Sequence, residues 1–234
     1  MKKAIYFIAI CISIIYTTSL FSQNCGYYIP LKPNTGTEMK SYDSNNKLTS
    51  TSKNTIISVT TEGEYTVANI KSEYIDELKG GKSSNEYKIK CNGSQFIIDT
   101  KSLLGSAMGA YKDMELKIES GEIEIPKNIA VGTKLKDSNL KMKAYTNGTL
   151  LSDMEYKYIN RKVESKESIT TPAGTFNCYK ITYDLAMVSK VMTFTTNSTT
   201  KVVDYYAENI GVVKSQIFND KGELLSYSIL NRIY

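Results

Sequence analysis

Apolar and polar residues alternate in short segments along this chain, and each segment ends in turn-forming residues. Successive side chains of a strand point to opposite faces of its sheet, so this alternation is typical of strands with one buried face. The best example alternates over residues 87–91, turns at Asn92-Gly93 and resumes at residues 96–98. Asn-Gly readily takes the positive φ angles of a tight turn, so the pattern predicts a β-hairpin.

The same pattern recurs to the end of the chain. Residues 116–118 and 123–125 flank Ser120-Gly121, which predicts a second hairpin, and Asn147-Gly148 between residues 142–144 and 150–151 predicts a third. Further expected strands span residues 56–61, 65–74, 156–163, 167–171, 176–185, 201–206, 212–218 and 224–230. The polar residues 193–200 are expected to form an edge strand or an exposed loop. Together these segments predict a mainly β protein.

Residues 102–114 depart from the pattern. They carry Leu103, Leu104, Met108 and Tyr111 near helical spacing, with glycines at positions 105 and 109. Each glycine weakens a helix by about 1 kcal/mol, so we expect one short, imperfect helix or a loop. In a curved sheet, such a segment would cover the concave face.

The N-terminus has the three parts of a secretory signal. Lys2 and Lys3 form a positive region, residues 4–16 are almost wholly apolar, and residues 17–22 are mostly small and polar. The apolar run is shorter than the roughly 20 residues of a membrane span, so residues 1–22 are expected to be a cleaved signal peptide rather than an uncleaved anchor. Asn24 precedes Cys25 where a lipobox needs a small residue, which argues against a lipoprotein. Residues 23–234 are expected to form a single β-rich envelope domain.

Charge and composition exclude several classes of protein. Loss of Lys2 and Lys3 lowers the formal net charge from +5 to +3, and the charges are interspersed, so no nucleic-acid partner is expected. No second apolar run could span a membrane once the signal is removed. Histidine is absent, which removes the commonest metal ligand and the commonest general base near neutral pH. We expect neither a metal nor a cofactor.

Three cysteines remain after signal removal: Cys25, Cys91 and Cys178. An oxidising compartment would allow one disulfide and leave one thiol. All three pairings are open, and Cys25–Cys91 is preferred because it would fix a loose N-terminal segment to the sheet, at a gain of about 4 kcal/mol in loop-closure entropy. Cys178 lies among apolar neighbours, which favours a buried inert thiol or half of a disulfide over a nucleophile.

Carboxylates are the remaining candidates for acid–base chemistry. A pair of them can hydrolyse glycosides, but only at a fixed separation in one cleft. The sequence shows no such convergence, so they are interpreted as solvated charges and the protein as no enzyme, with a carboxylate-based hydrolase as the alternative. The candidates are Asp43, Glu62, Glu64, Asp99, Glu115 and Asp204.

Residues 171–181, Thr-Pro-Ala-Gly-Thr-Phe-Asn-Cys-Tyr-Lys-Ile, begin with a tight turn, because proline fixes φ and glycine permits a left-handed bend. This stretch resembles a motif of the TapB-like exported bacterial proteins, which are related to the domain of unknown function 3108. Residues 205–215, Tyr-Tyr-Ala-Glu-Asn-Ile-Gly-Val-Val-Lys-Ser, resemble a second signature of that group. Shorter matches lie at residues 25–30, 111–115, 125–126 and 131–132.

The resemblance covers nearly all of the chain after residue 22. It implies a curved antiparallel sheet, a half-open barrel similar to LolA-type lipoprotein carriers and LppX-type lipid-binding proteins. It implies no settled activity and no catalytic residues, and fold analogy alone is a weak guide to function. The chain departs from the carriers in lacking tryptophan and a long helix.

The concave face of a curved sheet must be filled, covered or occupied by a ligand. Methionine is a flexible apolar lining residue, and the chain offers Met108, Met114, Met142, Met154, Met187 and Met192, with ordinary core packing as the alternative. The expected ligand-lining residues are Leu103, Leu104, Met108, Tyr111, Met142, Met154 and Met187.

These observations predict an exported protein of the periplasm, of the periplasmic side of the outer membrane, or of the exterior. Its expected partner is a lipid or another apolar or amphiphilic ligand, bound in the concavity. The alternative is a structural or assembly accessory of the cell envelope, which would act through a protein partner.

Overall fold

The computed structural model describes residue 25, residues 29–100 and residues 114–234. The signal segment and residues 102–113 of the expected cover lie outside these residues. The described strands are β1 (Gly36–Asp43), β2 (Leu48–Glu62), β3 (Tyr65–Asp76), β4 (Lys82–Cys91), β5 (Gln95–Asp99), β6 (Glu115–Ser120), β7 (Glu122–Pro126), β8 (Ser138–Thr146), β9 (Thr149–Thr171), β10 (Gly174–Val191), β11 (Phe194–Ala207), β12 (Gly211–Phe218) and β13 (Leu224–Ile233).

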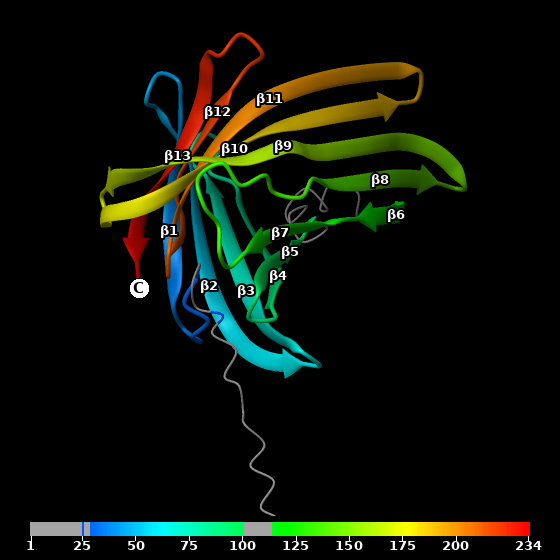
Figure 1. The fold of residues 1–234 in the computed structure, drawn as a ribbon. Coiled ribbons are helices and arrows are strands. Elements are labelled where there is room, and N and C mark those ends of the chain that lie inside the picture. Colours follow the sequence, from blue (N-terminus) through cyan, green and yellow to red (C-terminus); the bar gives the residue numbers. More distant parts are fainter. Residues whose placement is uncertain (1–24, 26–28, 101–113) are drawn as a thin grey trace, which may run out of the picture.

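All described strands belong to one antiparallel sheet, in the order β6-β8-β9-β10-β11-β12-β13-β1-β2-β3-β4-β5-β7. The sheet curls until it is nearly closed into a barrel (Figure 1). The predicted mainly β fold with a curved antiparallel sheet is therefore confirmed. Outer parts of β8–β11, residues 139–157 and 186–199, extend to one side, and we call them the arm (Figure 1).

Most predicted hairpins are present, with the expected turn chemistry. Asn92-Gly93 joins β4 to β5, and Gly93 has a φ of 82°. Asn147 and Gly148 join β8 to β9 with φ angles of 49° and 75°, as a tight hairpin turn requires. The two strands expected at residues 156–163 and 167–171 form parts of one strand, β9, because the bulged backbone between them keeps its pairing to β10.

The hairpin predicted around Ser120-Gly121 is wrong. β6 pairs with β8, whereas β7 pairs with β5, so these two consecutive strands stand at opposite ends of the sheet. A single residue, Gly121, separates them, and a tight hairpin needs a loop of two residues. The chain therefore runs on from one end of the sheet to the other, which joins the two ends covalently.

Hydrogen bonds at Gly121 close the barrel. Its N–H donates to the carbonyl of Asn139 on β8 over 2.7 Å, and its carbonyl accepts the N–H of Thr100, next to β5, over 3.1 Å. The hydroxyl of the fully buried Thr100 donates to the same carbonyl over 2.8 Å. A Cβ at position 121 would lie 2.8 Å from Oγ of Ser138 and 3.0 Å from the carbonyl of Asn139. Only glycine fits this approach without a shift of the surrounding structure.

Arg161 on β9 makes a second closing contact. Its side chain is buried, with 5% of the residue exposed, and its guanidinium donates to the carbonyls of Lys136 and Glu124. Glu124 lies on β7 and Lys136 lies just before β8, so the guanidinium links β9, the third strand from one end of the sheet, to β7 at the other end. Burial lowers the pKa of Arg161.

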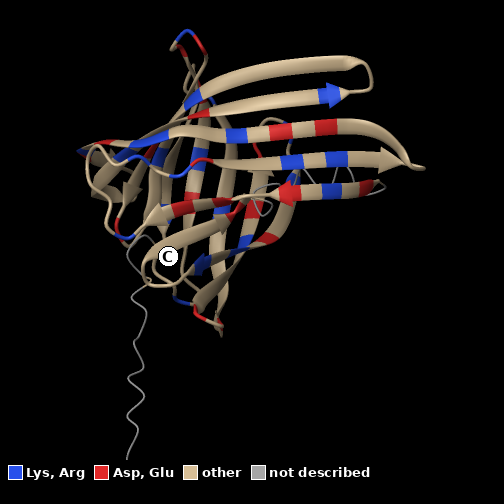
Figure 2. Ribbon diagram, turned by 45° about the vertical axis from the view of Figure 1, so that its right-hand side comes forward, with Lys and Arg blue, Asp and Glu red and all other residues tan. Residues whose placement is uncertain are grey.

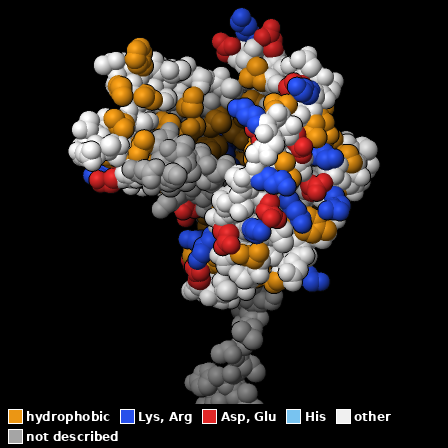
Figure 3. All heavy atoms as spheres, turned by 180° about the vertical axis from the view of Figure 1, so that it is seen from behind, with side chains coloured by type: hydrophobic (Ala, Val, Ile, Leu, Met, Phe, Trp, Pro, Cys, Tyr) orange, Lys and Arg blue, Asp and Glu red, His pale blue; other side chains and the backbone are white. Residues whose placement is uncertain are grey.

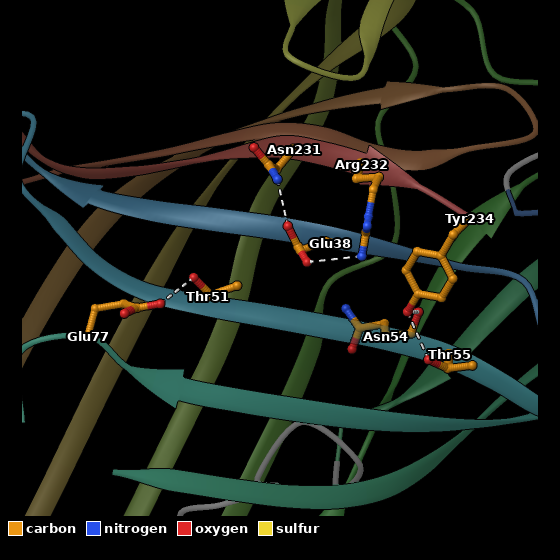
Figure 4. A network of polar contacts seen from close by, with 8 residues as sticks. All are labelled: Glu38, Thr51, Asn54, Thr55, Glu77, Asn231, Arg232 and Tyr234. Carbon is orange, nitrogen blue, oxygen red and sulfur yellow. Dashed lines mark hydrogen bonds and ion pairs between the residues drawn. The ribbon is translucent and has the colours of Figure 1, made fainter. Parts of the chain in front are cut away.

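The first and last strands are fixed to each other (Figure 4). The backbones of Gly36 and Tyr234 exchange two hydrogen bonds, of 2.8 and 3.1 Å. The Tyr234 hydroxyl lies 2.8 Å from Oγ1 of Thr55 on β2, and Asn231 donates to Glu38 across β13 and β1 over 2.6 Å. The C-terminus therefore holds β13, β1 and β2 together.

The largest hydrophobic cluster occupies the side of the barrel built by β2–β5. Its buried members include Ile56, Ile70, Ile89 and Phe96, together with Ile125 of β7. Cys25 and Cys91, which form a disulfide, belong to the same cluster. Residue 25 is thereby tied to the end of β4.

Candidate functional site

A cavity of about 180 Å³ lies against the inner side of β1–β5. Its lining residues are Ile29, Thr37, Met39, Asn54, Ile70, Tyr87, Ile89, Phe96, Ile98, Tyr206, Ile210, Gly211 and Val212. A smaller cavity of about 30 Å³ shares Ile29, Asn54, Ile70 and Ile210 with it. Viewed from behind, the molecule is hollowed and hydrophobic side chains gather on the walls of the hollow (Figure 3). The cavity combines a mainly apolar lining with few polar groups, which is typical of small-molecule sites.

Strand alternation explains the apolar wall of this cavity. Ile70 on β3 stands opposite Tyr87 on β4, and Ile89 on β4 stands opposite Ile98 on β5. Directly opposed residues share one face of a sheet, so these four side chains form one inward-facing group. Another part of the wall comes from residues around the turn between β11 and β12, where Ile210 is more than a hundred residues further along the chain than Ile98.

Two phenol groups are the titratable side chains in the lining. Burial raises the pKa of Tyr87 to about 12, and burial also raises the pKa of Tyr206. Both phenols are therefore uncharged at neutral pH and can donate or accept a hydrogen bond. The cavity is thus lined by a mainly apolar wall, two neutral phenols and the polar side chains of Thr37 and Asn54.

Asp204 lies close to the Tyr206 phenol and is buried, which corrects its interpretation as a solvated charge. On β11, Asp204 lies two residues from Val202 and two from Tyr206. Its side chain therefore points to the same face as theirs, the face that carries the cavity-lining Tyr206. Burial raises the pKa of its carboxyl, against the opposing effects of hydrogen bonds from Ser215 and Tyr183 and of the Arg161 charge. The Tyr183 hydroxyl donates to Oδ2 of Asp204 over 3.1 Å.

The other candidate carboxylates are half-buried or exposed, and none of them lies on β11 beside Asp204. Asp43 accepts two turn N–H groups over 2.9 Å each, in the connection from β1 to β2. Glu62 pairs with Lys88 over 3.0 Å and Glu115 with Lys117 over 3.8 Å, both on the surface. The contacts of Asp43, Glu62 and Glu115 are thus a turn and two surface ion pairs, as expected for solvated charges.

The ligand-lining residues expected from the sequence fall into two groups. Leu103, Leu104, Met108 and Tyr111 lie outside the described residues. Met142 and Met154 stand opposite each other on β8 and β9, in a buried cluster with Leu140, and Met187 stands opposite Tyr156. These three methionines lie on the arm, and none of them lines the 180 Å³ cavity.

Sequence reasoning missed the isoleucines and tyrosines that line the cavity. The alternation at residues 87–98 carried a usable signal, because it placed Tyr87, Ile89 and Ile98 on one face. The contribution of Tyr206 and Ile210 had no local signal, since it depends on which distant strands meet.

Cysteine and metal chemistry contribute little to this site. Cys178 is buried, and burial raises the pKa of its thiol to about 11, so the thiol stays protonated at neutral pH. Its Sγ lies 3.4 Å from the carbonyl of Phe176, to which the thiol donates. Within the described residues, no group of histidine, cysteine, aspartate and glutamate is arranged to hold a metal ion. In the same part of the chain, no helix is long and apolar enough to cross a membrane.

The fold and the cavity define a class of protein: an antiparallel sheet nearly closed into a barrel, with a mainly apolar cavity on its inner side. More particularly, the chain belongs to the DUF3108-like family, whose family model matches residues 34–230. The family relation expected from residues 171–181 and 205–215 is thereby confirmed.

Two solved structures share the fold. A candidate lipoprotein from Parabacteroides distasonis ATCC 8503 is 23% identical, with a TM-score of 0.71 over 90% of this chain and 100% of that chain. A candidate exported protein with a YmcC-like fold, from Bacteroides fragilis NCTC 9343, is 22% identical, with a TM-score of 0.69 and the same coverage. Among proteins with curated descriptions, none matches this chain.

Proposed function

We propose that this protein is an exported, non-catalytic envelope protein that binds the apolar part of a ligand inside its curved sheet. The observation that carries the proposal is the 180 Å³ cavity with its wall of isoleucine, phenylalanine and tyrosine. An apolar cavity of about 150 Å³ inside a protein stays dry and binds benzene. The cavity therefore suits one ring or a short alkyl segment, and the rest of a larger ligand would lie outside it.

The polar groups of the cavity favour an amphiphilic ligand. Tyr87, Tyr206 and Thr37 add hydroxyl groups and Asn54 adds an amide to a mainly apolar wall. A ligand with a hydroxyl, carbonyl or ester group next to its apolar part could exchange a hydrogen bond with such groups, which a pure hydrocarbon could not.

The proposed location rests on the N-terminal signal pattern in residues 1–22. Both structural relatives support it, since one is described as a candidate lipoprotein and the other as a candidate exported protein. The proposed compartment is the periplasm or the periplasmic side of the outer membrane, with release to the exterior as the alternative.

Ligand binding is tested by native mass spectrometry of the chain from Gln23 onward, and by displacement of a fluorescent fatty-acid probe. Ile98→Phe should reduce probe binding at least about tenfold, because the added ring fills the cavity. Ile57→Phe is the matched control, since it adds the same volume at a side chain that is 41% exposed. A protein that carries no exchangeable ligand, and whose two variants bind the probe equally, would contradict the proposal.

The alternative function, an assembly accessory acting through a protein partner, is favoured by one specific observation. β12 pairs with β11 only from Lys201 onward, so within the described residues no strand pairs with the outer edge of residues 194–200. An exposed strand edge without charges is a template for addition of another strand. The test is photo-crosslinking from position 197 in intact cells. A specific partner should be captured and lost in Ser198→Lys; capture of the same proteins by both forms would speak against it.

A further inference from the structure

The end of the arm carries a group of exposed apolar side chains. The turn between β8 and β9 and the turn between β10 and β11 lie side by side, because the N–H of Met192 donates to the carbonyl of Leu151 over 3.1 Å. We call these two turns the paired tips. Their exposed apolar residues are Leu150, Val191, Met192 and Phe194. Met192 and Phe194 are 75% and 77% exposed, more than any other large hydrophobic side chain in the described part of the chain.

The paired tips carry no charge. Residues 144–152 and 191–200 contain no lysine, arginine, aspartate or glutamate. In the ribbon view the charged residues of the arm lie along its strands, and the turns themselves are uncharged (Figure 2). Transfer of the tips into an apolar environment would therefore not require the burial of an ionised group, which is the costly step in such a transfer.

The backbone conformation of Met192 shows that folding alone does not explain why a methionine stands at this position. Met192 has a φ of 53°, a left-handed conformation that asparagine and glycine adopt at least cost. The neighbouring tip uses Asn147-Gly148 for the same purpose. A long apolar side chain at this position neither favours the turn nor packs in the core, so its value lies in what it meets outside the molecule.

The apolar face of the tips continues inward along the arm. Val191 stands opposite Phe194 and Ser152, and two residues further in, Ser189 stands opposite Met154, which pairs with Met142. Opposed residues share a face, so Phe194 and Val191 lie on the face that buries Met142 and Met154. Charged residues such as Lys190, Asp153 and Lys143 stand opposite one another on the other face.

We propose that the paired tips insert into a lipid surface, and so attach the end of the arm to a membrane. A stable protein interface takes about 20–30 residues from each side, whereas the paired tips offer only a few exposed apolar side chains on two turns. Shallow insertion into a lipid surface needs no matching partner, and its strength grows with the apolar area that is buried. The inference goes beyond the proposed ligand binding and does not depend on it.

Insertion is tested with a tryptophan probe, because the chain contains no tryptophan of its own. The protein is the chain from Gln23 onward, which contains every described residue and lacks the apolar N-terminal run that would itself bind lipid. Phe194→Trp should show a blue-shifted emission when vesicles of phosphatidylethanolamine and phosphatidylglycerol are added, and quenching by lipids brominated on their acyl chains. Leu78→Trp, at a distant site that is 54% exposed, should show neither effect. Unchanged emission of Phe194→Trp would overturn the proposal.

A second experiment measures the contribution of the tips to vesicle binding. Met192→Asn combined with Phe194→Thr should weaken flotation with the same vesicles at least about tenfold, while asparagine suits the turn and threonine suits the strand. Leu78→Asn combined with Val131→Thr is the matched control, since these residues are 54% and 58% exposed elsewhere. Equal circular dichroism spectra and melting temperatures verify that both double variants are folded.

The outcomes separate the alternatives. Equal vesicle binding by both double variants, or no binding by the unaltered chain, would overturn the proposal. A dimer in solution that only the tip variant dissociates would show instead that the tips bind a second copy of the chain, which also overturns it. Ile98→Phe, which fills the cavity, should bind vesicles normally, so failure of the ligand proposal can be told apart from failure of this one.

Discussion

Single residues decide how the two ends of this sheet meet. Gly121 lies where β6 ends and β7 begins, with backbone partners on both ends of the sheet. A Cβ there would lie 2.8 Å from Oγ of Ser138 and 3.0 Å from the carbonyl of Asn139, and this backbone cannot move aside as the end of a flexible side chain can. The barrel therefore depends on the absence of one methyl group.

Gly121→Ala should lower the free energy of unfolding by about 2–4 kcal/mol, as expected for overpacking at a position enclosed by backbone. Urea denaturation monitored by circular dichroism measures this change. Gly81→Ala is the control, because the nearest atom to its added Cβ would be 3.9 Å away, and it should change stability by less than about 0.5 kcal/mol. Equal effects of the two substitutions would refute the role of Gly121.

Asp204 makes stability depend on pH. Burial raises the pKa of its carboxyl in the folded protein above the ordinary value of 3.8, so the folded state binds a proton more tightly than the unfolded state does. Its contribution to stability is therefore complete below the unfolded pKa, and it is lost as the pH rises through the higher folded pKa. Each unit of the shift corresponds to about 1.4 kcal/mol.

Asp204→Asn should remove this dependence, since the neutral amide oxygen can still accept the hydrogen bond from Tyr183. The free energy of unfolding of the variant, relative to the unaltered protein, should increase as the pH rises from about 3.8 toward neutral. Denaturation at a series of pH values measures it. A difference that stays constant over this range, or changes in the opposite direction, would show that Asp204 is not the responsible group.

Elements of this fold are joined mainly by local turns, with one long-range covalent link. The disulfide connects Cys25, ahead of β1, to Cys91 at the end of β4, across 66 positions of sequence. Such a link restricts the unfolded chain over the whole length of the first four strands. The third cysteine, Cys178, lies on β10 and is unpaired.

Cys25→Ala combined with Cys91→Ala should reduce the free energy of unfolding by about 4 kcal/mol, through the loop-closure entropy that the unfolded chain regains. Chemical denaturation measures the loss, and Cys178→Ala serves as the control that leaves the disulfide intact. Thiol titration of the denatured protein should find one reactive group. Detection of three thiols in protein from an oxidising compartment would contradict the disulfide.

The whole molecule is one sheet, which is closed by a few contacts where its two ends meet. Gly121 joins its two ends through the backbone, and Arg161 joins β9 to β7 through its guanidinium. Both contacts exist only when the barrel is closed, so opening at either one should weaken the other. This coupling is a property of closure and of no single strand.

Gly121→Ala and Arg161→Met should therefore be less destabilising together than the sum of their separate effects. We expect a coupling of about 1 kcal/mol or more, the size found for residues that share a structural unit. Urea denaturation of both single variants, the double variant and the parent measures it. Strict additivity would show that the two contacts act independently.

The extent of sequence-based prediction differed between the strands and the site. Strand positions and most turns followed from residues 87–98 and similar segments, because the two-residue period of a strand is a local property. Asp204 was misjudged because its burial depends on one face of β11 turning toward the inside of the curled sheet, where Arg161 and Tyr183 interact with it. The cavity was missed because its wall combines β3–β5 with the distant turn at Ile210.

The sequence by itself determined the β content, the hairpin turns and the family relation, and its lack of histidine excluded catalysis by that residue. Only the tertiary structure decided that β6 and β7 stand at opposite ends of the sheet, joined through Gly121. Alternation specifies which face of a strand is buried, but it does not specify which strand lies beside it. Pairing between strands far apart in sequence arises from the curl of the complete sheet, and the closure and the cavity are both consequences of that curl.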